Sequence, residues 1–215
     1  ENLADAQKNL SLATLHPMIL PAAGLDPTHL DLEAAAAMRG FIQKHRQKLV
    51  AIGEVGLDHW VVKSESQLEI QREIFRSFIE LSKEVNLPLN VHSRSAGRHA
   101  IDILIKHGAT RVQLHAFEGK ASSAMPAVEA GFFFSIPSSL VRSGQKQKLV
   151  RRLPLSSLLV ETDSPVLGPV PNERNEPANA MIAIKAIAEL KEITKEEVVE
   201  NIAENTRRLY REIFS

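Results

Sequence analysis

The sequence predicts an α/β fold, an incomplete parallel (β/α)8 barrel of the TIM type, over one domain, residues 1–215. Short apolar runs of strand length recur along the chain, and longer segments with helical spacing separate them. Such alternation is typical of a parallel sheet covered by helices. The chain has 215 residues, whereas eight strand–helix units need about 250. The length therefore predicts fewer than eight units.

Six apolar runs are the expected strands. They are nearly continuous in apolar residues, as expected where both faces of a parallel strand are buried. In chain order they are Met18–Ala23, Leu49–Ile52, Leu87–Val91, Val112–Phe117, Phe132–Ile136 and Leu158–Val160. The expected helices are Asp31–Lys48, Gln67–Val85, Ala100–His107, Ala121–Ala130, Gln145–Arg152, Ala178–Leu190 and Lys195–Tyr210. Thr194, followed by acidic residues, is the expected N-cap of the last helix.

Composition excludes several classes of protein. Lys plus Arg and Asp plus Glu are both 26, so the formal charge is zero, which excludes a strongly basic nucleic-acid wrapper but leaves room for a local positive cleft. The sequence has no cysteine, which excludes disulfide scaffolds and thiolate sites. We expect a cytoplasmic protein, with the nucleus as an alternative. No apolar run approaches the roughly 20 residues that span a bilayer, and the polar opening segment predicts no signal peptide.

Ionisable residues lie where four of the apolar runs end. These residues are Glu54, His92, His115 and, within Glu161-Thr162-Asp163, Asp163. Taken singly, a glutamate at a strand end is usually solvated and a histidine there usually packs. Together they matter because strand carboxyl ends share one face of a parallel barrel. Two carboxylates and two imidazoles predict a site for a divalent metal, Zn, Mn or Mg.

Other residues have weaker assignments. We expect His45, His99 and His107 at the surface and His16 in a structural role, whereas His29 and His59 are undecided. For Trp60 two interpretations stay open, a base-stacking surface and a loop aromatic that covers the core, and the second is favoured.

Five motifs in order resemble the TatD family of metal-dependent deoxyribonucleases, and most closely its eukaryotic and archaeal members. They are GEVGLD at 53–58, LPLNVHSRSA at 87–96, LHAFEG at 114–119, ETDSP at 161–165 and RNEP at 174–177. The resemblance covers essentially the whole chain. It implies a barrel of the amidohydrolase kind that hydrolyses DNA with divalent metals.

The resemblance also implies roles for the strand-end residues. Glu54 resembles the carboxylate that bridges two metals, and His92 and His115 resemble the imidazoles of the second metal position. Asp163 resembles the aspartate that binds the first metal and orients or deprotonates the attacking water. Arg94 resembles a phosphate-contacting arginine.

Two departures from the family pattern bear on the site. Nothing in the sequence matches the His-x-His pair of the family's first strand, so the first strand, first helix and second strand are expected to be missing and at most one metal to be well held. Asp26 stands where the family usually has a histidine, and it is either a substrate-side residue or a turn cap. Arg174 is a weaker candidate for substrate positioning, with a loop salt bridge as its alternative.

The sequence leaves three functions open. The first is a metal-dependent deoxyribonuclease that acts on DNA, exonucleolytically by analogy with the family. The second is another hydrolase of the barrel superfamily that acts on an ester, amide or phosphotriester. The third is a catalytically impaired, non-enzymatic TatD-like protein. The sequence favours the first and leaves the oligomeric state open.

Overall fold

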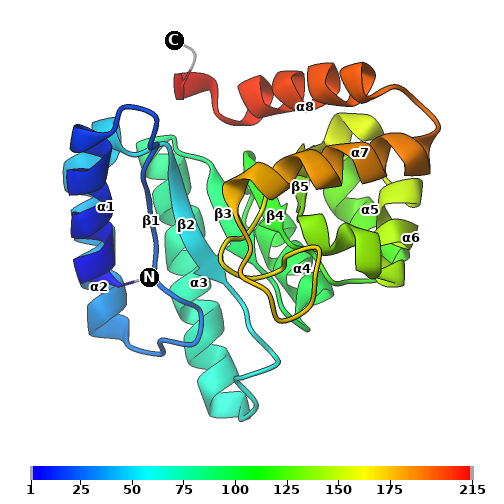
Figure 1. Ribbon diagram of the computed structural model, residues 1–215. Helices are drawn as coiled ribbons and strands as arrows, with labels where there is room; N and C mark the ends of the chain where they lie inside the picture. The colour runs from blue at the N-terminus through cyan, green and yellow to red at the C-terminus, as the bar shows by residue number, and fades with distance from the viewer. Residues whose placement is uncertain (1, 214–215) are drawn as a thin grey trace.

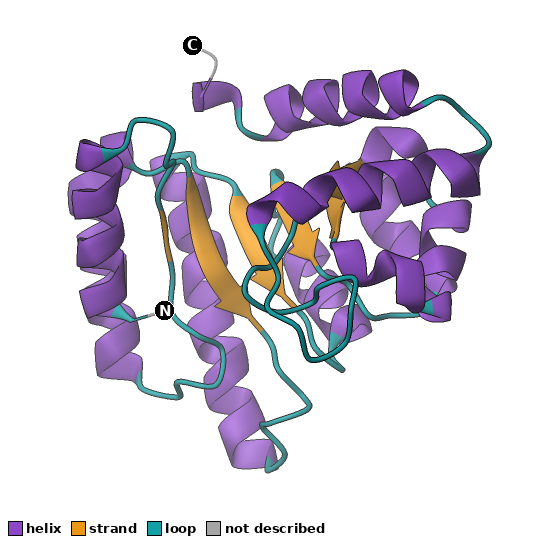
Figure 2. Ribbon diagram, viewed as in Figure 1, coloured by secondary structure: helices purple, strands orange, loops and turns teal. Residues whose placement is uncertain are grey.

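The computed structural model describes residues 2–213, which form one parallel sheet with helices packed along it (Figures 1 and 2). The strands are β1 (Ala22–Ala23), β2 (Ala51–Gly56), β3 (Leu89–His92), β4 (Val112–His115), β5 (Phe133–Ile136) and β6 (Leu158–Val160). The α-helices are α1 (Leu3–Leu15), α2 (Leu32–His45), α3 (Glu65–Val85), α4 (Gly97–Lys106), α5 (Ala121–Glu129), α6 (Gly144–Arg152), α7 (Ala180–Lys191) and α8 (Lys195–Leu209). Short 3-10 turns occupy Arg46–Lys48, Ser138–Arg142, Leu155–Ser157, Pro177–Asn179 and Arg211–Ile213.

Each strand pairs in parallel with the next one along the chain, in the order β1-β2-β3-β4-β5-β6. Within the described residues β1 and β6 are therefore the two edges of an open sheet. The predicted parallel α/β fold with an incomplete barrel is confirmed. None of the described helices has both the length and the apolar character needed to cross a membrane.

The first strand is shorter in the structure than the predicted segment Met18–Ala23. Only Ala22–Ala23 pairs with β2, and Met18 is 96 % exposed. Because β1 lies at an edge of the sheet, these apolar side chains have a strand neighbour on one side only. The second strand is longer than predicted, so that Glu54 lies inside β2 and not after it.

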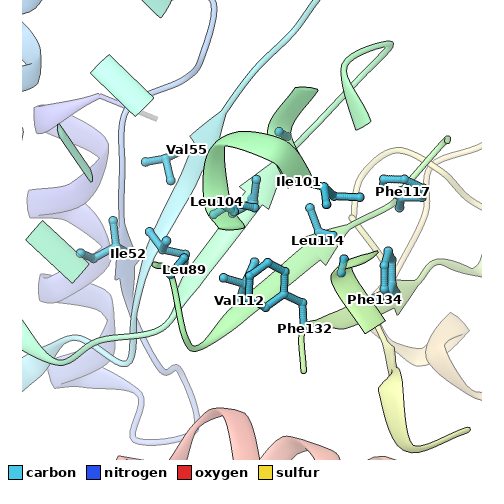
Figure 3. Packing of buried hydrophobic residues seen from close by; sticks show 14 of the residues in the cluster. Ile52, Val55, Leu89, Ile101, Leu104, Val112, Leu114, Phe117, Phe132 and Phe134 are labelled. Carbon is cyan, nitrogen blue, oxygen red and sulfur yellow. The ribbon is translucent and has the colours of Figure 1, made fainter. Parts of the chain in front are cut away.

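The strands carry different residues on their two faces. On β4, Val112 and Leu114 enter the main apolar cluster under the helices (Figure 3). Gln113 and His115 alternate with them along the strand and therefore point to the opposite face. The same alternation on β5 places Phe134 in the main cluster and Ser135 opposite it. The face that lies away from the main cluster is therefore the one that holds the polar side chains.

The C-terminal segment closes part of that second face. Phe133 and Leu159 pack there against Leu209, the last residue of α8, and against Tyr210, which follows it. In Figure 1, α8 runs beside α7 at one end of the sheet, and it contacts β6. The predicted N-cap Thr194 is confirmed, because its side chain forms a capping box with Glu197 at the start of α8. Side chains of the C-terminal segment thus lie in the interior behind the strand ends.

Candidate metal centre

Three neighbouring strands bring one carboxylate and two imidazoles together at their carboxyl ends. Oε1 of Glu54 on β2 lies 2.5 Å from Nδ1 of His92 on β3 and 3.1 Å from Nε2 of His115 on β4. The two imidazole nitrogens are 3.4 Å apart. The ligand atoms of all three residues lie within 4.8 Å of one another. The structure thus gathers three of the four residues predicted to bind metal.

An irregularity in β2 turns Glu54 toward the two histidines. Ile52 pairs with Leu89 and Val55 with Val91, so β2 uses one residue more than β3 over the same stretch. Ile52 and Val55 both enter the main apolar cluster. In a regular strand, residues three positions apart would face opposite sides of the sheet, so the strand is irregular between them. Such bulges re-aim side chains and are common beside active sites.

The close approach of β2 to β3 requires a glycine after Glu54. Gly56 has φ +146°, a conformation that residues with a Cβ rarely adopt. A Cβ placed on Gly56 would lie 2.1 Å from the carbonyl oxygen of His92. The glycine of the GEVGLD motif therefore sets the spacing between the strands that carry Glu54 and His92.

The donor set fits one divalent ion. Ligand atoms bound tetrahedrally at about 2.1 Å lie about 3.4 Å apart, close to the separation of the two imidazole nitrogens. Two histidines and a glutamate leave a fourth position open, which is typical of catalytic zinc sites. The side chains are 20 % (Glu54), 21 % (His92) and 9 % (His115) exposed, so the centre is mostly shielded from water.

Without metal, protons hold this cluster together. Burial disfavours the charged imidazolium of His115, but hydrogen bonds and charge attraction from Glu161 and Glu54 outweigh burial and raise the pKa of His115 to about 11. Burial likewise disfavours the Glu54 carboxylate, yet hydrogen bonds from His115 and His92 outweigh it and hold the pKa of Glu54 well below its usual range. A metal cation bound at the centre would displace the extra protons of the two imidazoles and supply the positive charge in their place.

The second nitrogen of each imidazole faces a carboxylate that is largely shielded from water. Nε2 of His92 lies 2.9 Å from Oδ2 of Asp58, and Nδ1 of His115 lies 3.7 Å from Oε2 of Glu161. The side chains of Asp58 and Glu161 are only 5 % and 14 % exposed. Carboxylates in this place fix the orientation and tautomer of metal-binding histidines. Sequence reasoning gave neither carboxylate a role, although both lie inside motifs quoted above.

A chain of hydrogen bonds holds Glu161 from the interior. Ser135 Oγ donates to Glu161 Oε2 over 2.6 Å, and Gln113 Nε2 donates to Ser135 Oγ over 2.9 Å. The hydroxyl of Tyr210 donates in turn to Gln113 Oε1. Burial and the nearby charge of Glu161 raise the pKa of Tyr210, so the phenol stays protonated. The C-terminal segment thereby supports the metal centre from behind.

The turn after His115 is fixed from two sides. Ala116 has φ +44°, a left-handed conformation that is uncommon outside glycine. Its N–H donates to Glu161 Oε1 over 2.7 Å, and its carbonyl accepts from Nζ of the buried Lys146 on α6 over 3.2 Å. Lys146 carries no pattern that marks it in the sequence.

Asp163 lies beside the centre and not in it. Its Oδ1 is 3.8 Å from Nδ1 of His115, on the edge of the ring opposite Glu54. Burial raises the pKa of Asp163. Asn175, from the RNEP motif, is 1 % exposed and donates to the carbonyls of Thr162 and Val166, which fixes the loop around Asp163.

The three predicted substrate-side residues are placed differently. Arg94 lines a cavity of about 340 Å³ together with His92, His115 and Asp163. Asp26 accepts from the backbone N–H and the hydroxyl of Thr28, which matches the turn cap considered above. Arg174 is exposed, and within residues 2–213 it forms no ion pair that would match the loop salt bridge considered as its alternative. For all three, contact with substrate stays a prediction.

Comparison with known proteins agrees with the motifs. The sequence model of the family described as TatD related DNase matches residues 1–211. The chain belongs to the TatD family. It is accordingly a metal-dependent hydrolase built on the barrel-type fold of that family.

Individual relatives support the same assignment for this TatD chain. It is 48 % identical to the human protein named deoxyribonuclease TATDN3 over 198 residues, which are 88 % of this chain and 71 % of the human one. It is 38 % identical to YabD, a metal-dependent hydrolase of Bacillus subtilis strain 168, with 89 % of this chain and 74 % of the relative covered. The crystal structure of YjjV, a TatD homologue from Escherichia coli K12, matches with a TM-score of 0.89 at 25 % identity over 98 % of this chain and 83 % of that one.

Proposed function

We propose that this TatD chain hydrolyses phosphodiester bonds in DNA and removes nucleotides from an end of the strand. One observation carries the proposal. His92 and His115, two members of the cluster with Glu54, line the same cavity as Arg94 and Asp163. That cavity combines a place for a metal, a cation for a phosphate and a base for a water molecule. The name of the human relative supports DNA as substrate.

Each side chain at the site would have its own role in the hydrolysis. A divalent ion held by Glu54, His92 and His115 would supply Lewis-acid charge that polarises a phosphoryl oxygen. Arg94 would bind the phosphate oxygens through its planar fork of donors. Asp163 would accept the proton of the attacking water, because burial raises its pKa toward the range where a general base works best.

We propose that this chain holds one ion well, zinc, manganese or magnesium. The described residues provide one group of three ligands, and Asp163 faces the opposite nitrogen of His115. Of the candidate metals, zinc has the strongest preference for imidazole nitrogen at tetrahedral sites. The metal content of the purified chain after dialysis against each ion would test how many ions it binds and which metal it prefers.

The activity is tested with metal-loaded protein and single-stranded DNA labelled at either end. We expect cleavage that EDTA abolishes, with mononucleotides released from linear strands and none from a circular strand. Asp163→Asn should lower the rate by about 10²–10⁴-fold, since it removes the base. The matched control is Asp102→Asn, at an exposed carboxylate on α4. Cleavage of a circular strand would overturn the terminal mode.

The same preparations separate the other two functions. Hydrolysis of carboxylic esters or phosphotriesters, with DNA left intact, would favour another hydrolase of the superfamily. No EDTA-sensitive turnover on any of these substrates would favour a non-enzymatic TatD-like protein. We also propose a cytoplasmic or nuclear location, on the cysteine-free sequence, which cell fractionation would test.

A further inference from the structure

The side chain of Trp60 is exposed to solvent and lies next to the candidate metal centre. It is the only tryptophan of the sequence, and 60 % of it is exposed. The core is filled by other aromatic side chains, chiefly phenylalanines such as Phe75, Phe78 and Phe134. The interpretation of Trp60 as a cover of the core therefore fails, and its exposed ring needs another explanation.

Two cations accompany the ring. The guanidinium of Arg94 lies 5.2 Å from the centroid of the Trp60 ring, and Nζ of Lys63 lies 5.6 Å from it. Both side chains are exposed. Arg94 also lines the cavity with His92 and Asp163, so it joins the tryptophan to the place where we expect a phosphate.

The loop that carries Trp60 is rigidly tied to the metal centre. Oδ1 of Asp58 accepts from the backbone N–H of Trp60 and of Val61, each over 2.8 Å, while Oδ2 of the same carboxylate contacts His92. The backbone N–H of His59 donates to the carbonyl of Arg94 over 2.9 Å. Because one carboxylate anchors both the loop and a metal ligand, the ring is held in a fixed relation to the centre.

An exposed aromatic ring with two cations close to it, beside the cavity that we expect to bind a phosphate, fits single-stranded nucleic acid. Bases of single strands stack on aromatic side chains, while lysine and arginine contact the phosphates between them. A base in a duplex is already stacked and paired, and it offers no free face to the ring. We propose that Trp60, Arg94 and Lys63 form a stacking site for an unpaired base next to the phosphate bound at the metal centre. This inference rests on the proposed nuclease function.

The single tryptophan allows a direct test. In EDTA, so that no strand is cut, the parent protein is titrated with a short single-stranded oligodeoxynucleotide, with a duplex of the same length and with inorganic polyphosphate. We expect single strands to quench the tryptophan emission and the other two polyanions to leave it nearly unchanged. Emission that stays constant at saturating single strand, or that polyphosphate quenches equally, would overturn the proposal.

Variants measured with a labelled oligonucleotide give a second readout. Trp60→Leu should weaken binding of the single strand by about 5- to 150-fold, and Trp60→Phe should retain part of the affinity, since a phenyl ring still stacks. Val61→Ala is the matched control, at an exposed residue of the same loop. Lys63→Gln should lower the slope of log affinity against log salt by about 0.7. Equal affinity of Trp60→Leu and parent would refute stacking.

These outcomes are independent of the nuclease assay. If EDTA-sensitive cleavage is found but Trp60 does not respond to single strands, the stacking site fails and the proposed function stands. If single strands quench Trp60 but no substrate is cleaved, the proposed function fails and a strand-binding surface remains.

Discussion

The carboxylate of Asp58 joins the metal ligand His92 to the loop that follows β2. Its Oδ2 accepts a hydrogen bond from Nε2 of His92 over 2.9 Å, and its Oδ1 accepts from two backbone N–H groups of the loop. A carboxylate can only accept, so Nε2 carries a proton whether His92 is charged or neutral. When metal displaces the other proton, which Nδ1 donates to Glu54, Nδ1 is left with the lone pair that binds the metal. Asp58 thereby selects the tautomer of His92 that can bind metal.

Replacing Asp58 by asparagine tests this role. The amide oxygen can still accept from the loop, but the amide nitrogen would face Nε2 of His92 and favour the other tautomer. We expect zinc affinity to fall by about 10- to 100-fold with the fold intact. The measurement is competition with a chromophoric chelator, and Asp102→Asn is the control. Unchanged affinity in Asp58→Asn would show that Asp58 does not orient the ligand.

The residues nearest the metal could be predicted from the sequence, whereas those behind them could not. His92 directly follows one apolar run and His115 lies within another, which is a strong local signal. Glu161 shares the parity of Leu159 on β6, so alternation places it on the inner face, but no sequence pattern marks it as the partner of His115. Asp58 lies in a loop, where no periodicity indicates the direction of a side chain.

Metal binding should depend strongly on pH. In the metal-free chain the pKa of His115 is raised to about 11, and that of His92 is raised as well, so metal must displace protons. Affinity should therefore increase from pH 6 to pH 9, by up to about tenfold per pH unit for each proton released. Calorimetry in two buffers of different ionisation enthalpy counts the protons. Binding without proton release would contradict the assigned protonation.

The same raised pKa predicts how the metal-free chain responds to alkali. A histidine whose pKa is higher in the folded state stabilises the fold fully below its unfolded pKa, about 6.5, and loses that contribution as pH rises toward about 11. We expect the thermal midpoint of the metal-free protein to fall between pH 7 and pH 10. In the zinc-loaded protein, where His115 is already neutral, the decrease should be smaller. A midpoint that rises with pH in the metal-free protein would show that this histidine does not carry the effect.

Tyr210→Phe probes the hydrogen-bond chain behind Glu161. The variant leaves Oε1 of the buried Gln113 without its donor. An unsatisfied buried acceptor costs about 1–3 kcal/mol, which in a chain of this size lowers the thermal midpoint by about 2–12 °C. Scanning calorimetry measures the shift. A midpoint equal to that of the parent protein would mean that the hydroxyl adds nothing to stability.

Asn175→Ala tests the loop that carries Asp163. Without the amide, the carbonyls of Thr162 and Val166 lose their donor, and Asp163 loses its fixed position. We expect kcat on single-stranded DNA to fall by about 10- to 100-fold, since small misplacements of a catalytic group are costly. Zinc affinity should stay within about threefold of the parent. Asn201→Ala, at an exposed position on α8, is the control. A variant with the kcat of the parent would show that Asn175 does not position Asp163.

Two further features, one strand and one buried lysine, could not be predicted correctly from the sequence, for physical reasons. The run at Met18–Ala23 looks like a buried strand by composition, but only two of its residues pair, because composition does not reveal that a strand lies at a sheet edge. Lys146 is buried at 6 % exposure because a single carbonyl, that of Ala116, and nearby carboxylates meet its charge. Such a contact depends on tertiary geometry that no local pattern encodes.

Anomalous diffraction from zinc-soaked crystals tests most directly whether Glu54, His92 and His115 hold one divalent ion. We predict one strong peak within about 2.0–2.2 Å of a Glu54 carboxylate oxygen, Nδ1 of His92 and Nε2 of His115. A peak at Nδ1 of His115, between Glu161 and Asp163, would contradict the assignment, as would zinc bound away from all three residues.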